Sequence, residues 1–373
     1  MKLKKEILIL FLLYFLTRFF YFSTGGFILK NKGFVKENYE RNYHLERENS
    51  AWVEAFYRWD APWYLYISEN GYTVNKNSPE FKKWGDIPFS AGFLPLFPYT
   101  IKFFKIFFGS SEISGIILGF IFGFSAFLSF YFLIKKYIKD YAFFSTLFFM
   151  FFPTSIFISL PYAEGLFLTL LFLFLLSIEN NFIEGYLLLP LLILTRPQGF
   201  YTIFIILFFK KSFKKKLFLF ILFIIGVLTL FTIYYQELGS IFPFLQRQSM
   251  SRGIVLGPWH GFIEFFLWKD KGIFSWKGSW IDLFLSIIFI LLIFISKQRK
   301  NFPLWAQIWT YIVLLFPLCS SFLSYQRLQL PAFPIFGILG VVLKKKIFWV
   351  LILLLFLAQF YYFYRYVTFQ WIA

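Results

Sequence analysis

Runs of about 20 apolar residues recur from one end of the chain to the other, and they constrain the fold more than any other feature. Residues 7–29, 113–134 and 217–235 are three examples. A helix of about 20 apolar residues crosses a hydrocarbon core of roughly 30 Å. Because no water satisfies backbone polar groups inside a bilayer, these runs must be helical. The sequence therefore predicts an all-α, polytopic membrane protein.

The composition excludes an ordinary soluble domain. Hydrophobic residues make up 59% of the chain and charged residues 15%, whereas soluble domains carry about 25% charged residues. The run at 7–29 is too long for the hydrophobic region of a signal peptide, so we interpret it as the first membrane helix. We find no soluble domain, linker or internal repeat. We expect a single integral membrane domain over residues 1–373, with about eleven transmembrane helices.

The lysines fall in short clusters between the apolar runs, which explains the net charge of +18 better than nucleic-acid binding does. If these clusters are cytoplasmic, an even number of helices must separate any two of them. The resulting topology has a large outer loop at about 30–112 and a second outer loop at about 236–277. The clusters lie at 2–5, 135–139, 210–216, 297–300 and 344–346.

The first outer loop is expected to contain interfacial helices. Residues 89–108 combine apolar side chains with Pro95, Pro98, Lys102 and Lys105. This mixture suits a helix that lies along the membrane surface better than one that spans the membrane.

The centre of the same loop contains the motif Arg58-Trp59-Asp60. Asp60 can serve as the N-cap of a short helix, with Pro62 in its first turn and Gly71 as its stop. Capping is one interpretation of Asp60. The other is an acid that deprotonates a sugar hydroxyl in a site partly shielded from water.

Three charged residues outside this loop are placed on the same side of the membrane. Arg196 lies between two short apolar helices, in a broken pair whose junction we expect inside a protein cavity. A charge at that depth is costly, which indicates a partner such as a bound phosphate; the alternative is an arginine that snorkels to the surface or is paired within the protein. Arg327 faces the same compartment. Glu164, near a helix start, is either a favourable N-terminal charge or a second active-site acid.

The remaining candidates are aromatic or polar residues of the outer segments. The aromatic residues fit an interfacial belt, and they also fit stacking on a sugar or lipid. The candidate substrate-binding residues are Arg58, Trp59, Trp63, Tyr64, Tyr162, Glu164, Arg196, Gln246 and Arg327, and Asp60 is the candidate catalytic residue.

The sequence lacks the motifs of several common enzyme classes. There is no Asp-x-Asp pair, glycine-rich phosphate loop or nucleophile elbow, which argues against nucleotide-sugar, ATP and serine-hydrolase chemistry. A sugar donor carried on a lipid phosphate remains. We predict no cofactor and no metal site, although Asp60 with Glu164 would be the place for a divalent ion.

Five segments, taken in order along the chain, carry a resemblance to a known family. They are Arg58-Trp59-Asp60 through Gly71-Tyr72, Phe93-Leu94-Pro95-Leu96-Phe97-Pro98, Phe151-Phe152-Pro153-Thr154 through Phe167, Leu194-Thr195-Arg196-Pro197-Gln198-Gly199, and Arg327 with Leu330 to Pro334. The chain resembles the PIG-V-like mannosyltransferases, the family of GPI mannosyltransferase II and its prokaryotic relatives. It departs from the family at Ala163, where Ser is common, and at Leu328, where Tyr or Phe is common.

The resemblance implies a branch of the GT-C superfamily and its fold. It also implies mannose transfer from polyprenyl or dolichyl phosphate, with inversion, to a glycolipid, glycan or protein acceptor. Asp60 matches the first-loop acid regarded as the base in that family. We therefore expect an enzyme of the prokaryotic plasma (inner) membrane, embedded among membrane lipids, with its active site facing outside.

Two other classes of function remain open from the sequence. A multi-pass transporter or lipid flippase would also contain intramembrane arginines and broken helices. A noncatalytic assembly subunit is the third interpretation. The crowding of acids into one outer loop and the absence of repeated halves favour the enzyme.

Overall fold

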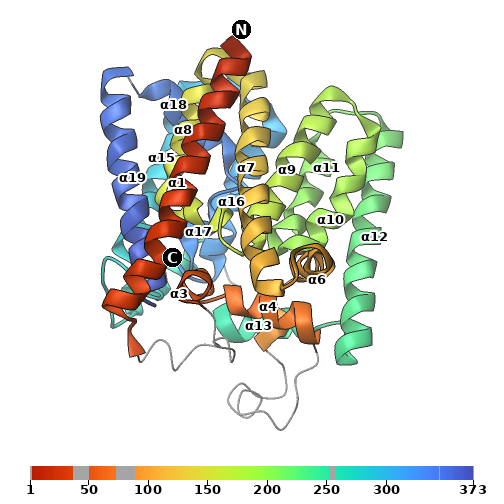
Figure 1. Cartoon of the computed structure of the whole chain (residues 1–373). Helices are drawn as coiled ribbons and strands as arrows, with labels where there is room; N and C mark the ends of the chain where they lie inside the picture. The colour runs from red at the N-terminus through yellow and green to blue at the C-terminus, as the bar shows by residue number, and fades with distance from the viewer. Residues whose placement is uncertain (1, 37–49, 73–88, 253–256, 344, 373) are drawn as a thin grey trace.

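A computed structural model describes residues 2–36, 50–72, 89–252, 257–343 and 345–372. Regular structure in these ranges is helical, and the β contact they contain is an isolated bridge between Gly272 and Ser279. The long helices run roughly side by side, and Figure 1 shows α1 (Lys2–Lys32) descending from the N-terminus. The predicted all-α class is confirmed.

Five helices within the described ranges are long and apolar enough to cross a membrane. They are α1, α7 (Ser111–Tyr137), α9 (Ala163–Asn180), α12 (Phe213–Leu238) and α19 (Lys345–Val367). Their outer surfaces are apolar, since Leu16 of α1 and Leu228 of α12 are 60% and 57% exposed. Such a surface is stable in hydrocarbon and not in water. The chain is therefore an integral membrane protein.

Shorter apolar helices complete the bundle. They are α8 (Ala142–Phe151), α10 (Leu188–Thr195), α11 (Thr202–Phe208), α15 (Trp280–Ile295), α16 (Leu304–Leu315) and α18 (Phe333–Val342). The expected number of about eleven spans stays a prediction, because these helices are shorter than a straight membrane span.

One predicted helix is not continuous. The sequence predicts a single helix over 141–160, but α8 ends at Phe151 and a 3-10 helix, η3 (Pro153–Ile158), follows. Phe152 adopts φ −58° and ψ 134°, outside the helical region. A residue before proline is disfavoured in helical geometry, so Pro153 explains the break.

The core of the bundle depends on close approach between helices. α7 packs along α9, and a Cβ added at Gly165 would lie 2.3 Å from the Ile158 carbonyl oxygen and 3.3 Å from the Gly123 nitrogen. Small residues allow such approach in membrane proteins.

Arg18 joins the first and last helices of the bundle. It is buried, its Nε donates to Ser159 Oγ at 3.0 Å, and its Nη1 donates to Gln359 Oε1 on α19 at 3.3 Å. Arg18 is therefore buried against neighbouring helices, with partners for its charge inside the protein.

Short helices gather at the end of the bundle opposite the N-terminus, which we call the loop end. Figure 1 shows α3 (Ala51–Glu54), α4 (Ala61–Asn70), α6 (Leu96–Phe108) and α13 (Pro243–Arg252) there. The helix predicted within 89–108 is confirmed as α6, preceded by the 3-10 helix η1 (Phe89–Gly92). Parts of the two predicted outer loops, 37–49, 73–88 and 253–256, lie outside the described residues.

Candidate active site

The helix α4 presents Asp60 at its start. α4 begins at Ala61, carries Pro62 in its first turn and stops at Gly71, whose φ is 69°. These bounds are the predicted ones. The Asp60 carboxylate makes no capping hydrogen bond; instead its Oδ2 accepts from Arg327 Nη2 at 2.7 Å. The backbone of Asp60 therefore marks the helix start, while its side chain is committed to an ion pair.

The residue before Asp60 turns the chain sharply. Trp59 has φ 56°, a left-handed conformation that is costly for a residue with a side chain. Its half-buried ring packs against Phe369 and Trp371, with ring centroids 5.5 and 5.2 Å away. The packing holds the strained turn from which Asp60 projects.

Arg58 is buried, with 1% of its surface exposed. Its Nε donates to the Val367 carbonyl oxygen at 3.0 Å, and its Nη1 donates to Glu54 Oε1 at 3.3 Å. The Arg58 backbone N–H donates to the Tyr366 hydroxyl at 3.1 Å. These contacts tie the Asp60 loop to the end of α19.

Glu164 is the shared ion-pair partner of two arginines. It stands in the first turn of α9 and its side chain is 3% exposed. Oε1 of Glu164 forms an ion pair with Arg196 Nη1 and lies 3.0 Å from Arg327 Nε. Asp60, Glu164, Arg196 and Arg327 thus form one network, which we call the arginine–carboxylate cluster.

The break between α10 and the 3-10 helix η5 (Pro197–Tyr201) places Arg196 in the cluster. Arg196 is extended, with φ −150° and ψ 152°, as expected for a residue before proline. Gln198 Oε1 accepts from Arg196 Nε at 3.1 Å, and Gln198 Nε2 donates to the Leu328 carbonyl oxygen at 2.9 Å. The junction is buried as expected, and Gln198, absent from the predicted site residues, fixes the arginine within it.

Arg327 is the centre of the cluster. It belongs to the four-residue helix α17 (Tyr325–Leu328), and its guanidinium lies over the rings of Phe157 and Tyr162 at 5.2 and 5.5 Å. Burial alone lowers the pKa of Arg327, but the Asp60 and Glu164 carboxylates outweigh burial and raise the pKa above its usual value. Arg327 is therefore a permanent cation.

The Tyr162 hydroxyl bridges the backbone around Asp60. It donates to the Arg58 carbonyl oxygen at 2.8 Å and accepts from the Asp60 N–H at 3.3 Å. Burial raises the pKa of this hydroxyl well above its usual value, so it stays protonated and keeps donating.

The other predicted residues differ in their distance from the cluster. Tyr64 is buried on α4 with its ring centroid 6.1 Å from that of Tyr162, so it lines the same region. Trp63 is buried against Phe89, away from the surface position that an interfacial belt requires. Gln246 is exposed on α13 and is not one of the ion-paired residues of the cluster.

The cluster balances two positive and two negative charges, but its members differ in access to solvent. The side chains of Glu164 and Arg196 are 3% and 8% exposed, whereas that of Asp60 is 29% exposed. Two fixed guanidinium groups can bind a phosphate, and a more accessible carboxylate can meet a hydroxyl from outside. Among the described residues, no group of three His, Cys, Asp or Glu side chains is placed to hold a metal ion.

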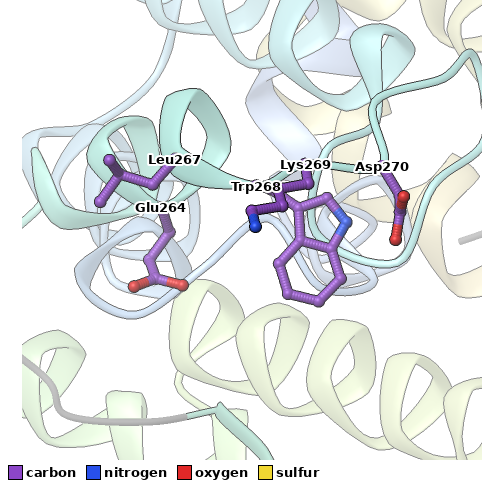
Figure 2. A pocket seen from close by; sticks show the side chains of 5 residues that line it. All are labelled: Glu264, Leu267, Trp268, Lys269 and Asp270. Atoms are coloured by element: carbon purple, nitrogen blue, oxygen red, sulfur yellow. The ribbon is translucent and has the colours of Figure 1, made fainter.

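A separate pocket of about 380 Å³ opens at the end of α14 (His260–Leu267). Figure 2 shows the Glu264 carboxylate and the Trp268 ring pointing the same way beside it. All of its lining residues lie within 264–270, so it shares no residue with the arginine–carboxylate cluster.

Comparison with known proteins identifies the fold. No family model matches the chain, and no curated protein matches it significantly. It is similar to the crystal structure of ArnT from Cupriavidus metallidurans bound to undecaprenyl phosphate, with a TM-score of 0.52 and 13% sequence identity. The match covers 80% of this chain, which spans 60% of the ArnT chain. Membership of the PIG-V-like family stays a prediction, and the predicted GT-C-like membrane fold is confirmed.

Proposed function

We propose that the chain is a GT-C glycosyltransferase that moves a sugar from a polyprenyl-phosphate donor to an acceptor hydroxyl. The observation that carries this proposal is the arginine–carboxylate cluster, in which Arg196 and Arg327 share Glu164 and Arg327 also pairs with Asp60. The undecaprenyl phosphate bound to ArnT, a protein of similar fold, supports a donor of this class.

The phosphate of the donor binds by replacing a carboxylate on the arginines. In the structure, both guanidinium groups form ion pairs with Glu164, and Arg327 also pairs with Asp60. A lipid phosphate offers oxygens that match the planar guanidinium geometry. We assign Arg196 and Arg327 to binding of the phosphate. Glu164, which pairs with both arginines, holds the two guanidinium groups next to each other.

The same exchange frees the base. Arg327 Nη2 lies 2.7 Å from Asp60 Oδ2, so this oxygen is occupied by the ion pair and is not free to accept a proton from the acceptor hydroxyl. When the donor phosphate attracts Arg327, the Asp60 carboxylate becomes available to the acceptor hydroxyl. Binding of the donor thereby precedes activation of the acceptor.

The transfer is a single nucleophilic displacement at the anomeric carbon of the sugar. Asp60 takes the proton of the acceptor hydroxyl while the oxygen attacks the anomeric carbon. The bond from that carbon to the phosphate oxygen breaks on the opposite face, which inverts the configuration. Polyprenyl phosphate leaves with an additional negative charge, which Arg196 and Arg327 stabilise.

Mannose as the sugar rests on the resemblance to PIG-V-like enzymes. A glycolipid, glycan or protein is the acceptor. The lysine clusters support a cytoplasmic N-terminal end, with the loop end and its cluster facing the outside of the plasma (inner) membrane.

The test compares purified wild-type protein with Asp60→Asn. Radiolabelled polyprenyl-phosphate mannose is the donor, and membranes from cells lacking the chain supply the acceptor. A general base contributes about 10²- to 10⁴-fold, so D60N should lose activity in that range. Glu69→Gln, which changes another acid of α4, should retain activity.

Two results would contradict the proposal in different ways. Equal transfer by wild type and D60N would remove Asp60 as the base. A wild-type protein that moves labelled lipid across vesicles without any covalent product would instead be a transporter or flippase. The same assay with polyprenyl-phosphate glucose tests the choice of mannose.

A further inference from the structure

A second buried acid lies close to the cluster without belonging to it. Asp282 stands in the first turn of α15, an apolar helix, and is 1% exposed. An acid at such a place is costly and requires a partner. Helix capping does not explain it, because Ser279 Oγ already accepts from the Asp282 N–H at 3.3 Å.

The Asp282 carboxylate binds the backbone one residue before Arg327. Its Oδ1 accepts from the Gln326 N–H at 3.1 Å, across 44 residues of sequence. Gln326 is fully buried, so this N–H needs an acceptor supplied by the protein.

Two further groups hold Gln326 from other elements. Thr154 Oγ1 in η3 donates to its carbonyl oxygen at 3.2 Å. The Tyr362 hydroxyl of α19 donates to its side-chain Oε1 at 2.7 Å. The backbone N–H, the backbone carbonyl and the side-chain carbonyl of Gln326 are therefore each fixed by a different element.

The short helix that carries Arg327 depends on such contacts. α17 has four residues, too few to be stable alone. It follows Ser324, which has φ 55° and hence a left-handed backbone conformation. Surrounding contacts, and not local preference, must impose this geometry.

We propose that Asp282 is a positioning residue for Arg327. By holding the Gln326 N–H, it sets the start of α17 so that the next residue reaches both Asp60 and Glu164. This inference deepens the proposed function and rests on it, because the value of a fixed Arg327 lies in binding the donor phosphate. A displacement of 1 Å at a reacting group can cost about 10²-fold in rate.

The test separates the hydrogen-bond acceptor from the bulk of the side chain. Asp282→Asn keeps an oxygen at the Oδ1 position, whereas Asp282→Leu has similar volume and no acceptor. Transfer is measured with polyprenyl-phosphate mannose as donor. D282L should show a higher KM for the donor and a lower kcat, with a combined loss of about 10- to 100-fold. D282N should stay within about threefold of wild type.

A matched control lies on the same helix. Ser286 is fully buried one turn further along α15, and its hydroxyl donates to the Leu283 carbonyl oxygen. Ser286→Ala should leave the donor KM unchanged, because it removes a buried polar group without touching α17. Thr154→Val, which removes the second contact to the Gln326 backbone, should raise the donor KM severalfold even if D282L does not fold.

The outcomes distinguish this inference from the proposed function. A folded D282L protein with wild-type donor KM and kcat would overturn the positioning role, as would a D282N defect equal to that of D282L. Absence of transfer by wild type would contradict the proposed function alone. A structure of D282L then still tests the positioning role, which requires Arg327 to have moved away from Asp60.

Discussion

Arg327 Nη2 lies 2.7 Å from Asp60 Oδ2, although 267 residues separate them in sequence. The pair connects the loop after the first membrane helix to the short helix that precedes α18. The same guanidinium also faces Glu164 at 3.0 Å. Arg327 is therefore the point at which three distant parts of the chain meet.

Replacing Arg327 tests its role as the shared cation. Arg327→Gln leaves two carboxylates facing one guanidinium, and breaking a buried ion pair costs about 3 kcal/mol. We expect that loss in the free energy of unfolding in detergent micelles, together with weaker binding of undecaprenyl phosphate. Arg327→Lys should recover part of the stability and less of the binding, because an ammonium cannot contact two carboxylates or a phosphate in the same planar manner. A fully active R327Q protein would contradict the phosphate assignment.

Glu164→Gln should also destabilise the protein. Arg196 and Arg327 lose the charge that both of them share, in a site where the Glu164 side chain is 3% exposed. The expected loss is about 3 kcal/mol in the free energy of unfolding. The matched control is Glu184→Gln in the exposed turn before α10, which should change stability by less than about 0.5 kcal/mol. Equal effects of the two substitutions would show that the cluster contributes nothing to stability.

Tyr162→Phe removes the hydroxyl that bridges Arg58 and Asp60. A lost hydrogen bond of this kind costs about 1 kcal/mol of stability. The transfer rate should fall severalfold as well, because the backbone of Asp60 is released. Tyr14→Phe removes a comparable bond, from α1 to the Phe120 carbonyl oxygen, and should cost similar stability without lowering the rate. Activity assays on both proteins at matched folded fractions decide the outcome.

Gly71→Ala tests the end of α4. The residue has φ 69°, and an added Cβ would lie 2.6 Å from Glu237 Oε2, which accepts from the Tyr72 N–H. Gly109→Ala at the end of α6 has a similar φ of 79° but open space around the Cβ. Both should pay about 1 kcal/mol of backbone strain. G71A should be destabilised further in thermal unfolding, and equal melting temperatures would show that Glu237 moves away freely.

The sequence was sufficient to predict α4, because its determinants are local. An acid, a proline in the first turn and a terminal glycine fix the start and stop of the helix. The partner of the Asp60 side chain could not be predicted, because the same carboxylate can either cap the helix or form an ion pair. Only the position of Arg327, set by the whole bundle, decides between them.

The sequence also places Arg196 and Glu164 on one side of the membrane without showing that they touch. Membrane topology restricts a residue to one end of the bundle and leaves its neighbours open. The role of Asp282 could not be predicted from the sequence for a different reason. An acid in a first helical turn is a common local feature, and nothing nearby in sequence reveals its contact with Gln326.

The link between Arg18 and Gln359 has a consequence for biosynthesis. The Ser159 hydroxyl that accepts from Arg18 Nε is made 141 residues after the arginine, and the Gln359 amide that accepts from Nη1 is made 341 residues after it. At about 5 to 20 residues per second, that second acceptor emerges roughly 20 to 70 s later. During this interval the first membrane segment contains a guanidinium that is still short of one native partner. In a ribosome-bound nascent chain, α1 should therefore still contact lipid or the insertion machinery. Its native contact with α19 forms only after Gln359 has been synthesised.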